Sequence, residues 1–289
     1  MSTVNVTITG ASGFLGTRLT QRLQEAKHTV RAVSRKSMES GQFADDLASA
    51  DAVVHLAGEP VAQRWTEAVK KRIYDSRVEG TRHLVNVLSK QSQRPRVLVC
   101  ASAVGYYGSR GDQILTEASS PGADFLARVV VGWEEAAQLA ESLGLRVVRL
   151  RFGMVLGQGG ALARLLPPFR FGLGGRLGSG HQWMAWIHIE DAVNLILFAL
   201  DYAAVRGAVN ATAPHPVTNE EFTGRLAIEL HRPAILPIPV FALKLAFGEM
   251  SEVLLASQRV LPTVAKSAGF RFQYPDLQGA LANVIAART

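Results

Sequence analysis

Three glycines near the start of the chain have the spacing of a dinucleotide-binding turn. Gly10, Gly13 and Gly16 follow an apolar, β-branched run at residues 4–9 and open a stretch with leucines at helical spacing. In a strand–turn–helix of this kind, the first glycine permits a tight turn and the second lets a pyrophosphate approach the backbone. The third lets the helix pack closely on the strand. The helix N-terminus then presents free N–H groups to the phosphates, so residues 10–16 predict dinucleotide binding.

Two cations follow the second predicted strand, where the adenosine ribose of a bound dinucleotide is expected. An acidic residue about 20 residues after the glycine turn is typical of NAD-binding proteins, because it holds the ribose hydroxyls. Here Arg35 and Lys36 take that place, and no carboxylate stands there. Their charges favour a 2′-phosphate, and therefore NADP(H) over NAD(H). The alternative interpretation is that both are solvated loop charges.

The third predicted strand ends in small residues that permit a close approach to the backbone. Leu56, Ala57 and Gly58 stand at its carboxyl end. In an open parallel sheet this edge faces the ligand crevice, so we expect the segment to contact the cofactor. An ordinary exit from strand to loop is the alternative.

A parallel sheet is needed to bring these segments to one edge, and the chain alternates accordingly. Apolar runs predict strands at residues 4–9, 30–34, 52–56, 97–101, 146–150 and 208–211, and amphipathic stretches predict helices around residues 15–26, 66–90, 125–143 and 190–203. This alternation predicts an α/β fold with a doubly wound, mostly parallel sheet. We expect the nucleotide-binding layer at residues 1–155 and a smaller substrate-side cap at residues 156–289, with residues 184–213 returning to the layer.

Composition narrows the class of protein. The chain has 289 residues, 48% of them hydrophobic, a net charge of +7 and a pI near 9.8. Its basic residues are scattered and lack interleaved aromatics, so we expect an anionic cofactor or substrate rather than nucleic acid. No signal peptide, membrane span or membrane partner is indicated, and we expect a cytoplasmic protein. The histidines show no paired ligand spacing and there is one cysteine, so no metal site is predicted.

Four segments carry a resemblance to the extended short-chain dehydrogenases/reductases. They are residues 9–16, 56–58, 102–108 and 186–191. More narrowly, the chain is similar to the poorly characterised "epimerase family" branch, some members of which are labelled as cell-division inhibitors. The resemblance implies an NADP-binding Rossmann layer, a small substrate cap, and possible homodimers through the helices at residues 66–90 and 125–143.

The resemblance also implies a set of cofactor contacts. Carried over residue by residue, they are Gly10, Ser12, Gly13, Phe14, Leu15, Gly16, Arg35, Lys36, Leu56, Ala57, Gly58 and Arg77. Arg77 lies on a predicted helix, where a surface ion pair is the alternative role.

The usual proton-transfer pair of this superfamily is missing. Its enzymes use a tyrosine as acid or base, with a lysine four residues later that lowers the tyrosine pKa. The five tyrosines here are followed at that spacing by Val78, Arg110, Gly111, Arg206 and Gln278. Where the pair is expected, in the helix that leads into Trp133, the residues are Leu126 and Val130. Standard hydride chemistry therefore lacks its proton donor.

Two hydroxyl groups are candidates to replace it. Ser102 matches the superfamily's substrate-polarising serine in position, although it could equally cap local backbone. Tyr107, or its neighbour Tyr106, could supply a phenol with Arg110 as the nearby cation, although packing is the more ordinary role of such tyrosines. For His188 and Asp191, before an apolar helix, we favour a structural role.

A glycine-rich stretch at residues 171–180 predicts a loop that could cover substrate. Arg170 or Arg176 could then bind an anion, but glycines also mark ordinary connections. The sequence thus predicts an NADP(H)-dependent oxidoreductase or epimerase acting on a small carbonyl or nucleotide-sugar-like substrate. The alternatives are a non-catalytic NADP(H)-binding regulator or redox sensor and, on positive charge alone, a nucleic-acid-associated factor.

Overall fold

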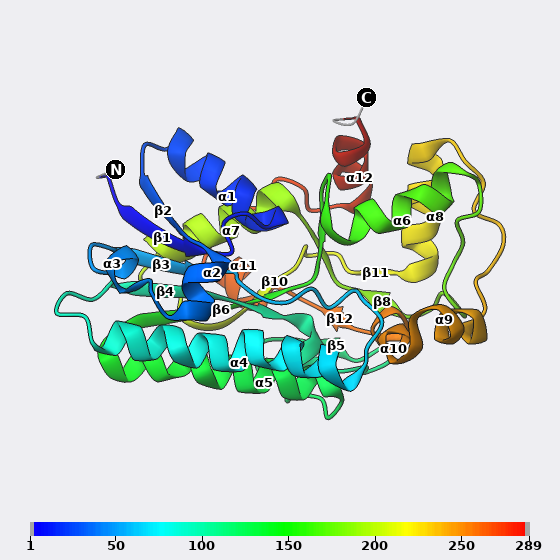
Figure 1. Ribbon diagram of the computed structural model, residues 1–289. Helices are drawn as coiled ribbons and strands as arrows, with labels where there is room; N and C mark the ends of the chain where they lie inside the picture. Colours follow the sequence, from blue (N-terminus) through cyan, green and yellow to red (C-terminus); the bar gives the residue numbers. More distant parts are fainter. Residues whose placement is uncertain (1–2, 287–289) are drawn as a thin grey trace.

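Six parallel strands form the central sheet of the computed structural model, which describes residues 3–286 (Figure 1). In spatial order they are β2 (Thr29–Val33), β1 (Asn5–Thr9), β3 (Ala52–His55), β4 (Val97–Ala103), β6 (Arg146–Phe152) and β10 (Gly207–Ala211). The sheet is built outward from β1 in both directions, so the ends of β1 and β3 flank the crevice where doubly wound folds bind ligands. The predicted α/β fold and its mostly parallel sheet are confirmed.

Helices cover both faces of the sheet, as Figure 1 shows. The helices α1 (Phe14–Glu25) and α7 (Ile189–Asp201) lie on one face, and α4 (Glu67–Ser89) and α5 (Phe125–Gln138) lie on the other. Alternate strand residues enter the two cores: Ile8 and Val54 pack toward α1 and α7, whereas Val53 packs toward α4 and α5. A sheet buried on both faces explains the nearly continuous apolar runs of its strands.

Two strands are longer than the sequence predicts. β4 and β6 each extend two residues beyond the apolar run that marked them. The extra segments contain Ser102 and Arg151, whose polar side chains interrupt the apolar pattern although they are buried. Periodicity alone therefore ended both strands too early.

Shorter elements connect the layer and build the C-terminal part. Between β2 and β3 lie α2 (Arg35–Ser40) and α3 (Ala44–Leu47), and two 3₁₀ helices, η1 (Val104–Tyr107) and η2 (Leu139–Leu143), follow β4 and α5. Three two-stranded sheets pair β5 (Ile114–Leu115) with β12 (Arg259–Val260), β7 (Met154–Leu156) with β9 (Trp186–His188), and β8 (Trp183–Met184) with β11 (Val217–Thr218). The remaining helices are α6 (Gly160–Arg170), α8 (Asn219–Leu230), α9 (Val240–Phe247), η3 (Gly248–Met250), α10 (Ser251–Leu255), α11 (Thr263–Ser267) and α12 (Leu277–Ala286).

A second core holds the C-terminal part together. Trp186 of β9 and Phe222 of α8 are its largest fully buried side chains, and they pack with leucines of α6 and α12. The boundary expected at residue 155 falls inside β7, and α7 and β10 return to the central sheet. Within residues 3–286, no helix combines the length and apolar character needed to cross a membrane.

Candidate functional site

The register of the sheet aligns the three predicted cofactor segments at one edge. Thr9 pairs with Val33 of β2 and with His55 of β3. The glycine turn, the segment that begins at Ser34 and the segment that begins at Leu56 therefore leave the sheet side by side. This is the carboxyl edge of parallel strands, where such folds bind their ligands.

Steric contacts explain the glycines of the turn. Gly10 has a φ of +75°, and a Cβ there would stand 2.8 Å from the Ala57 backbone nitrogen. A Cβ on Gly16 would overlap the Gly10 carbonyl oxygen and lie 2.8 Å from the Ala11 Cα. A Cβ on Gly13 would stand 3.2 Å from the Gly10 oxygen, which is a milder contact. Gly10 and Gly16 thus close the turn against the sheet, and Gly13 leaves its outer side accessible.

The N-terminus of α1 is left uncapped. Gly13 occupies the N-cap position without a side-chain hydrogen bond. In contrast, Thr66 caps α4 and Asp124 caps α5, each accepting a backbone N–H through its side chain. The first N–H groups of α1 therefore stay available for an anion, and the helix dipole favours negative charge there. The turn fits a pyrophosphate.

Arg35 and Lys36 stand in the first turn of α2, directly after β2. Both side chains are exposed, and within residues 3–286 neither has a hydrogen bond or an ion pair. Ser34 caps this helix by accepting the Ser37 N–H at 3.0 Å. Two unpartnered cations are thus held at the edge where the adenosine ribose of a dinucleotide would lie.

A hollow of about 430 Å³ adjoins the glycine turn. Its lining comes from the turn, from α1 and from β2: Ala11, Ser12, Thr17, Thr20, Gln21, Gln24 and Ala32. Of the predicted contacts, Ser12 is the one that borders this space.

A buried histidine connects the turn to α4. The His55 Nδ1 lies 2.6 Å from Thr9 Oγ1, and its Nε2 lies 2.9 Å from Thr81 Oγ1. Burial, reinforced by the charge of Arg77, lowers the pKa of His55 to about 4. The ring is therefore neutral at neutral pH, with one nitrogen that donates and one that accepts. Sequence reasoning missed this residue, whose only signal was a histidine inside an apolar strand.

Arg77 lies on α4, and its guanidinium packs against the end of β3. A Cβ on Gly58 would stand 3.2 Å from the Arg77 Cζ, and Arg77 Nη1 donates to the Glu59 carbonyl oxygen at 2.9 Å. The guanidinium also lies over the Trp133 ring, 5.1 Å from its centroid. Burial lowers the Arg77 pKa to about 10, so the group remains cationic at neutral pH. No carboxylate within residues 3–286 forms an ion pair with it, and it holds the segment beside the crevice in place.

Ser102 belongs to a buried polar row at the carboxyl ends of three strands. It pairs in register with Arg151 of β6, which pairs with Asn210 of β10. Ser102 Oγ donates to Glu134 Oε1 at 2.6 Å. Arg151 binds the same carboxylate in bidentate fashion, at 2.7 and 2.8 Å. The side chains of Arg151 and Glu134 are only 4% and 5% exposed, so Ser102 points into a closed ion pair.

Tyr107 completes this network. Its Oη donates to Asn210 Oδ1 at 2.6 Å and accepts from Arg151 Nη1 at 2.9 Å. The side chain is fully buried, and burial raises the Tyr107 pKa. The cation expected beside it, Arg110, instead donates to the backbone carbonyls of Tyr107, Ser120 and Pro121. For Ser102 and Tyr107 alike, the geometry favours a structural role over the catalytic one, because their hydroxyls are engaged and enclosed.

The helix face expected to carry the tyrosine–lysine pair is apolar. A Cβ on Gly105 of η1 would stand 3.6 Å from Leu126 Cβ and 3.9 Å from Val130 Cγ2. Both side chains thus occupy the place beside the end of β4, and neither can transfer a proton.

His188 and Asp191 join elements together. His188 Nδ1 accepts the Glu190 N–H at 3.2 Å and so caps α7. Asp191 accepts the backbone N–H groups of Gln273 and Tyr274 at 2.7 and 2.9 Å. Burial lowers the pKa of His188 to about 4. These contacts agree with the structural role favoured for both.

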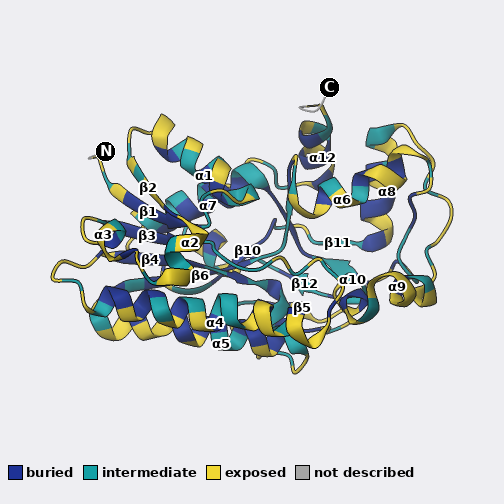
Figure 2. Ribbon diagram, in the orientation of Figure 1, coloured by how far each residue is buried: buried dark blue, intermediate teal, exposed yellow. Residues whose placement is uncertain are grey.

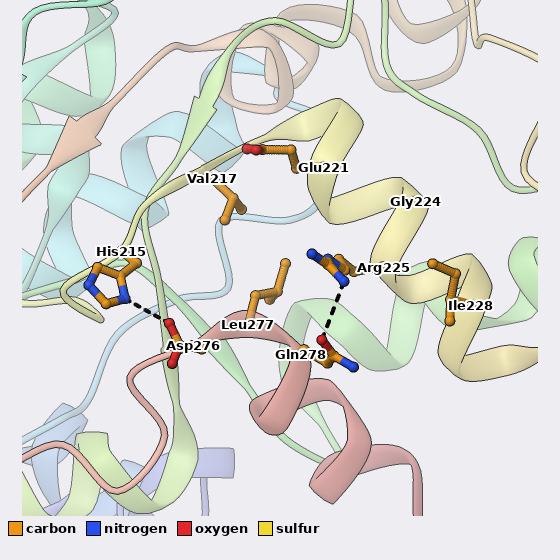
Figure 3. Close-up of a pocket in the computed structure, with 9 residues that line it drawn as sticks. All are labelled: His215, Val217, Glu221, Gly224, Arg225, Ile228, Asp276, Leu277 and Gln278. Carbon is orange, nitrogen blue, oxygen red and sulfur yellow. Dashed lines mark hydrogen bonds and ion pairs between the residues drawn. The ribbon is translucent and has the colours of Figure 1, made fainter.

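A larger hollow, of about 590 Å³, lies in the C-terminal part between α8 and the start of α12 (Figure 3). His215 Nδ1 stands 2.8 Å from Asp276 Oδ1 at one end, and Arg225 donates to Gln278 on the other side. None of the predicted site residues lines it. Within residues 3–286, no group of three or more His, Cys, Asp or Glu side chains is placed to hold a metal ion.

Comparison with known proteins identifies the family. The model of the NAD dependent epimerase/dehydratase family matches residues 6–211. The chain belongs to this family. A domain of unknown function, DUF1731, matches residues 238–284. The resemblance to extended short-chain dehydrogenases/reductases, and to their epimerase-family branch, is confirmed.

Individual relatives agree with this assignment. The epimerase family protein YfhF of Bacillus subtilis is 40% identical over 300 residues and covers 99% of both chains. The structure of human epimerase family protein SDR39U1 with NADPH superposes with a TM-score of 0.91 at 34% identity, covering 98% of this chain and 99% of that one. A nucleoside-diphosphate sugar epimerase of Corynebacterium glutamicum gives a TM-score of 0.82 at 34% identity, over 99% of this chain and 59% of that one.

Proposed function

We propose that this chain binds NADP(H) at the carboxyl edge of its sheet and uses it to oxidise, reduce or epimerise a small carbonyl or nucleotide-sugar-like substrate. The observation that carries the proposal is the uncapped N-terminus of α1 beside two unpartnered cations, Arg35 and Lys36. The helix terminus fits a pyrophosphate, and the two cations fit a 2′-phosphate. The human relative solved with NADPH supports the choice of cofactor.

The residues at the edge have separate tasks in this proposal. The turn at residues 10–16 holds the pyrophosphate, Arg35 and Lys36 hold the 2′-phosphate, and the segment at residues 56–58 lies against the dinucleotide. Arg77 keeps this last segment in position. The bound cofactor supplies hydride transfer at its nicotinamide. Because Leu126 and Val130 are apolar and the Tyr107 hydroxyl is engaged, none of these three side chains supplies the proton.

A second candidate function, NADP(H) binding without turnover, is favoured by the same missing relay. A regulator or redox sensor needs the cofactor edge but needs no proton donor. Ser102 and Tyr107 are bound within a buried network, which is compatible with a site that only binds.

Cofactor titration tests the binding step. In the Arg35→Ala/Lys36→Ala double variant, loss of charge-assisted hydrogen bonds worth about 1.5–3 kcal/mol each lowers NADPH affinity by at least about tenfold. NADH affinity changes little, because NADH lacks the 2′-phosphate. Arg206→Ala is the matched control, since it removes an exposed arginine that directly precedes β10, at the opposite edge of the sheet. Quenching of protein fluorescence reports both affinities, and equal losses for NADPH and NADH would contradict the proposed contact.

Isotope transfer then distinguishes the two candidates. The chain is incubated with NADPH deuterated at C4 on either face and with a panel of aldehydes, ketones and nucleotide sugars. Deuterium in a product, from one face only, supports the oxidoreductase or epimerase. An epimerase or an alcohol oxidation starts from the oxidised cofactor, so the same panel is also incubated with NADP+. Tight NADPH binding without transfer to any compound, and with no compound converted in the presence of NADP+, leads to the non-catalytic candidate instead. The homodimer through α4 and α5, and the cytoplasmic location, stay predictions that sedimentation and fractionation can check.

A further inference from the structure

Two stretches of the C-terminal half carry cations but no carboxylates. Residues 161–182 and 231–247 contain no aspartate or glutamate, whereas the whole chain has 24 in 289 residues. Their cations are Arg164, Arg170, Arg176, Arg232 and Lys244. On neighbouring elements, Glu220 and Glu249 are already in ion pairs, with Arg176 and Lys70. Glu229 of α8 and Glu252 of α10 also lie on neighbouring elements and form no ion pair within residues 3–286, so the positive charge is that of the two stretches themselves.

The two stretches lie side by side in the fold. Leu177 and Ile238 form a parallel bridge, and Arg232 Nε donates to the Arg170 carbonyl oxygen at 3.0 Å. A Cβ on Gly175 would overlap the Leu236 carbonyl oxygen, which explains a glycine at this crossing. The second stretch continues into α9, at the end of the molecule remote from β2 (Figure 1).

Large apolar side chains project from this surface into solvent. α9 buries only Leu243, and most of the helix is exposed in Figure 2. The six most exposed apolar side chains of the two stretches are Phe171 (80%), Leu173 (65%), Ile235 (82%), Leu236 (67%), Phe241 (74%) and Leu245 (76%). We call these six residues, with Arg170, Arg232 and Lys244, the apolar–cationic face. Large apolar side chains left exposed on adjoining segments are candidates for an interaction site in a soluble domain.

We propose that the apolar–cationic face binds an anionic lipid surface. Projecting apolar side chains can enter the boundary between headgroups and acyl chains, while arginine and lysine stems extend to the lipid phosphates. A second copy of this chain is a poor occupant, because a symmetric contact of this face would place the cations of both copies in one interface, and neither stretch has a carboxylate to pair with them. The proposal concerns surface association alone and does not depend on NADP(H) chemistry.

Co-sedimentation of the full chain with vesicles tests this inference. Vesicles that contain phosphatidylglycerol bind the protein, vesicles of pure phosphatidylcholine bind it much less, and added salt weakens the interaction. Phe241→Ser/Leu245→Ser lowers vesicle affinity by roughly tenfold or more, because two inserted side chains are lost. Lys244→Glu lowers it by about fivefold or more.

Matched controls come from exposed residues outside the face. Leu139→Ser removes a leucine that is 54% exposed near the end of α5, and Lys266→Glu reverses an exposed lysine on α11. Both leave vesicle binding unchanged, and all variants keep their NADPH titration and thermal melting curve. Failure of the unaltered chain to bind anionic vesicles overturns the proposal, as does equal binding by the Phe241 and Leu245 variant. If the unaltered chain binds no vesicles but forms a dimer or a complex with an acidic protein, and the Phe241 and Leu245 variant abolishes it, that partner takes the place of lipid.

Discussion

Replacing Glu134 by glutamine tests whether the polar row is a structural element. Glu134 accepts three hydrogen bonds, one from Ser102 at 2.6 Å and two from Arg151 at 2.7 and 2.8 Å. The substitution keeps the shape of the side chain but removes its charge. Arg151, whose side chain is 4% exposed, then remains buried without a counter-ion.

The expected loss follows from the burial of both partners. Removing one partner of a buried ion pair costs about 3–5 kcal/mol of stability, because the other charge stays buried and unpaired. Replacing both partners by apolar residues of similar volume costs far less. For a chain of this size, roughly 2 °C is lost per kcal/mol, so Glu134→Gln melts about 6–10 °C lower. Replacing Glu134 and Arg151 together by leucine recovers part of this loss, because no charge is then left unpaired.

Thermal and urea unfolding without cofactor measure these differences. Glu79→Gln is the control, because Glu79 pairs with Arg82 at 2.8 Å while both side chains are about half exposed, 53% and 48%. Its expected cost is below about 0.5 kcal/mol. If Glu134→Gln unfolds like Glu79→Gln, the network does not hold the strand ends together. The structural role inferred for Ser102 and Tyr107 then fails with it.

Two further predictions concern the turn and its support. Gly16→Ala weakens NADPH binding strongly and costs about 1–3 kcal/mol of stability, because its Cβ would meet the backbone of Gly10 and Ala11. Gly224→Ala in α8 is the control, because a Cβ there meets nothing within 4 Å. We expect this variant to keep its NADPH affinity and to be neutral or stabilising in urea unfolding. The pKa of His55 is about 4 in the folded chain and about 6.5 when unfolded, so below pH 6.5 the unfolded chain binds the extra proton. On account of His55, the free energy of unfolding then falls by about 2 kcal/mol between pH 7 and pH 5. Urea midpoints measured against pH should fall less steeply for His55→Gln than for the unaltered chain. An equal slope for the two proteins would refute this contribution.

Local patterns in the sequence were sufficient for the fold and for the cofactor edge. Apolar periodicity located every strand of the central sheet, because a strand covered on both faces has to be apolar along its length. The glycine turn could be recognised from the sequence because only glycine fits at positions 10 and 16, where a Cβ would meet backbone atoms. Arg35 and Lys36 could be placed because they follow a recognisable strand.

Contacts between distant segments decided what the sequence alone could not. By itself, the sequence determined a dinucleotide-binding layer without a tyrosine–lysine pair, since these features are set by residue type and local spacing. Only the tertiary structure paired Ser102 with Glu134, and Tyr107 with Asn210, 103 residues away along the chain. It likewise joined two separate stretches into the apolar–cationic face. Burial and partner choice depend on the packing of whole elements, so a hydroxyl that looks catalytic in sequence can be fully engaged in the folded chain.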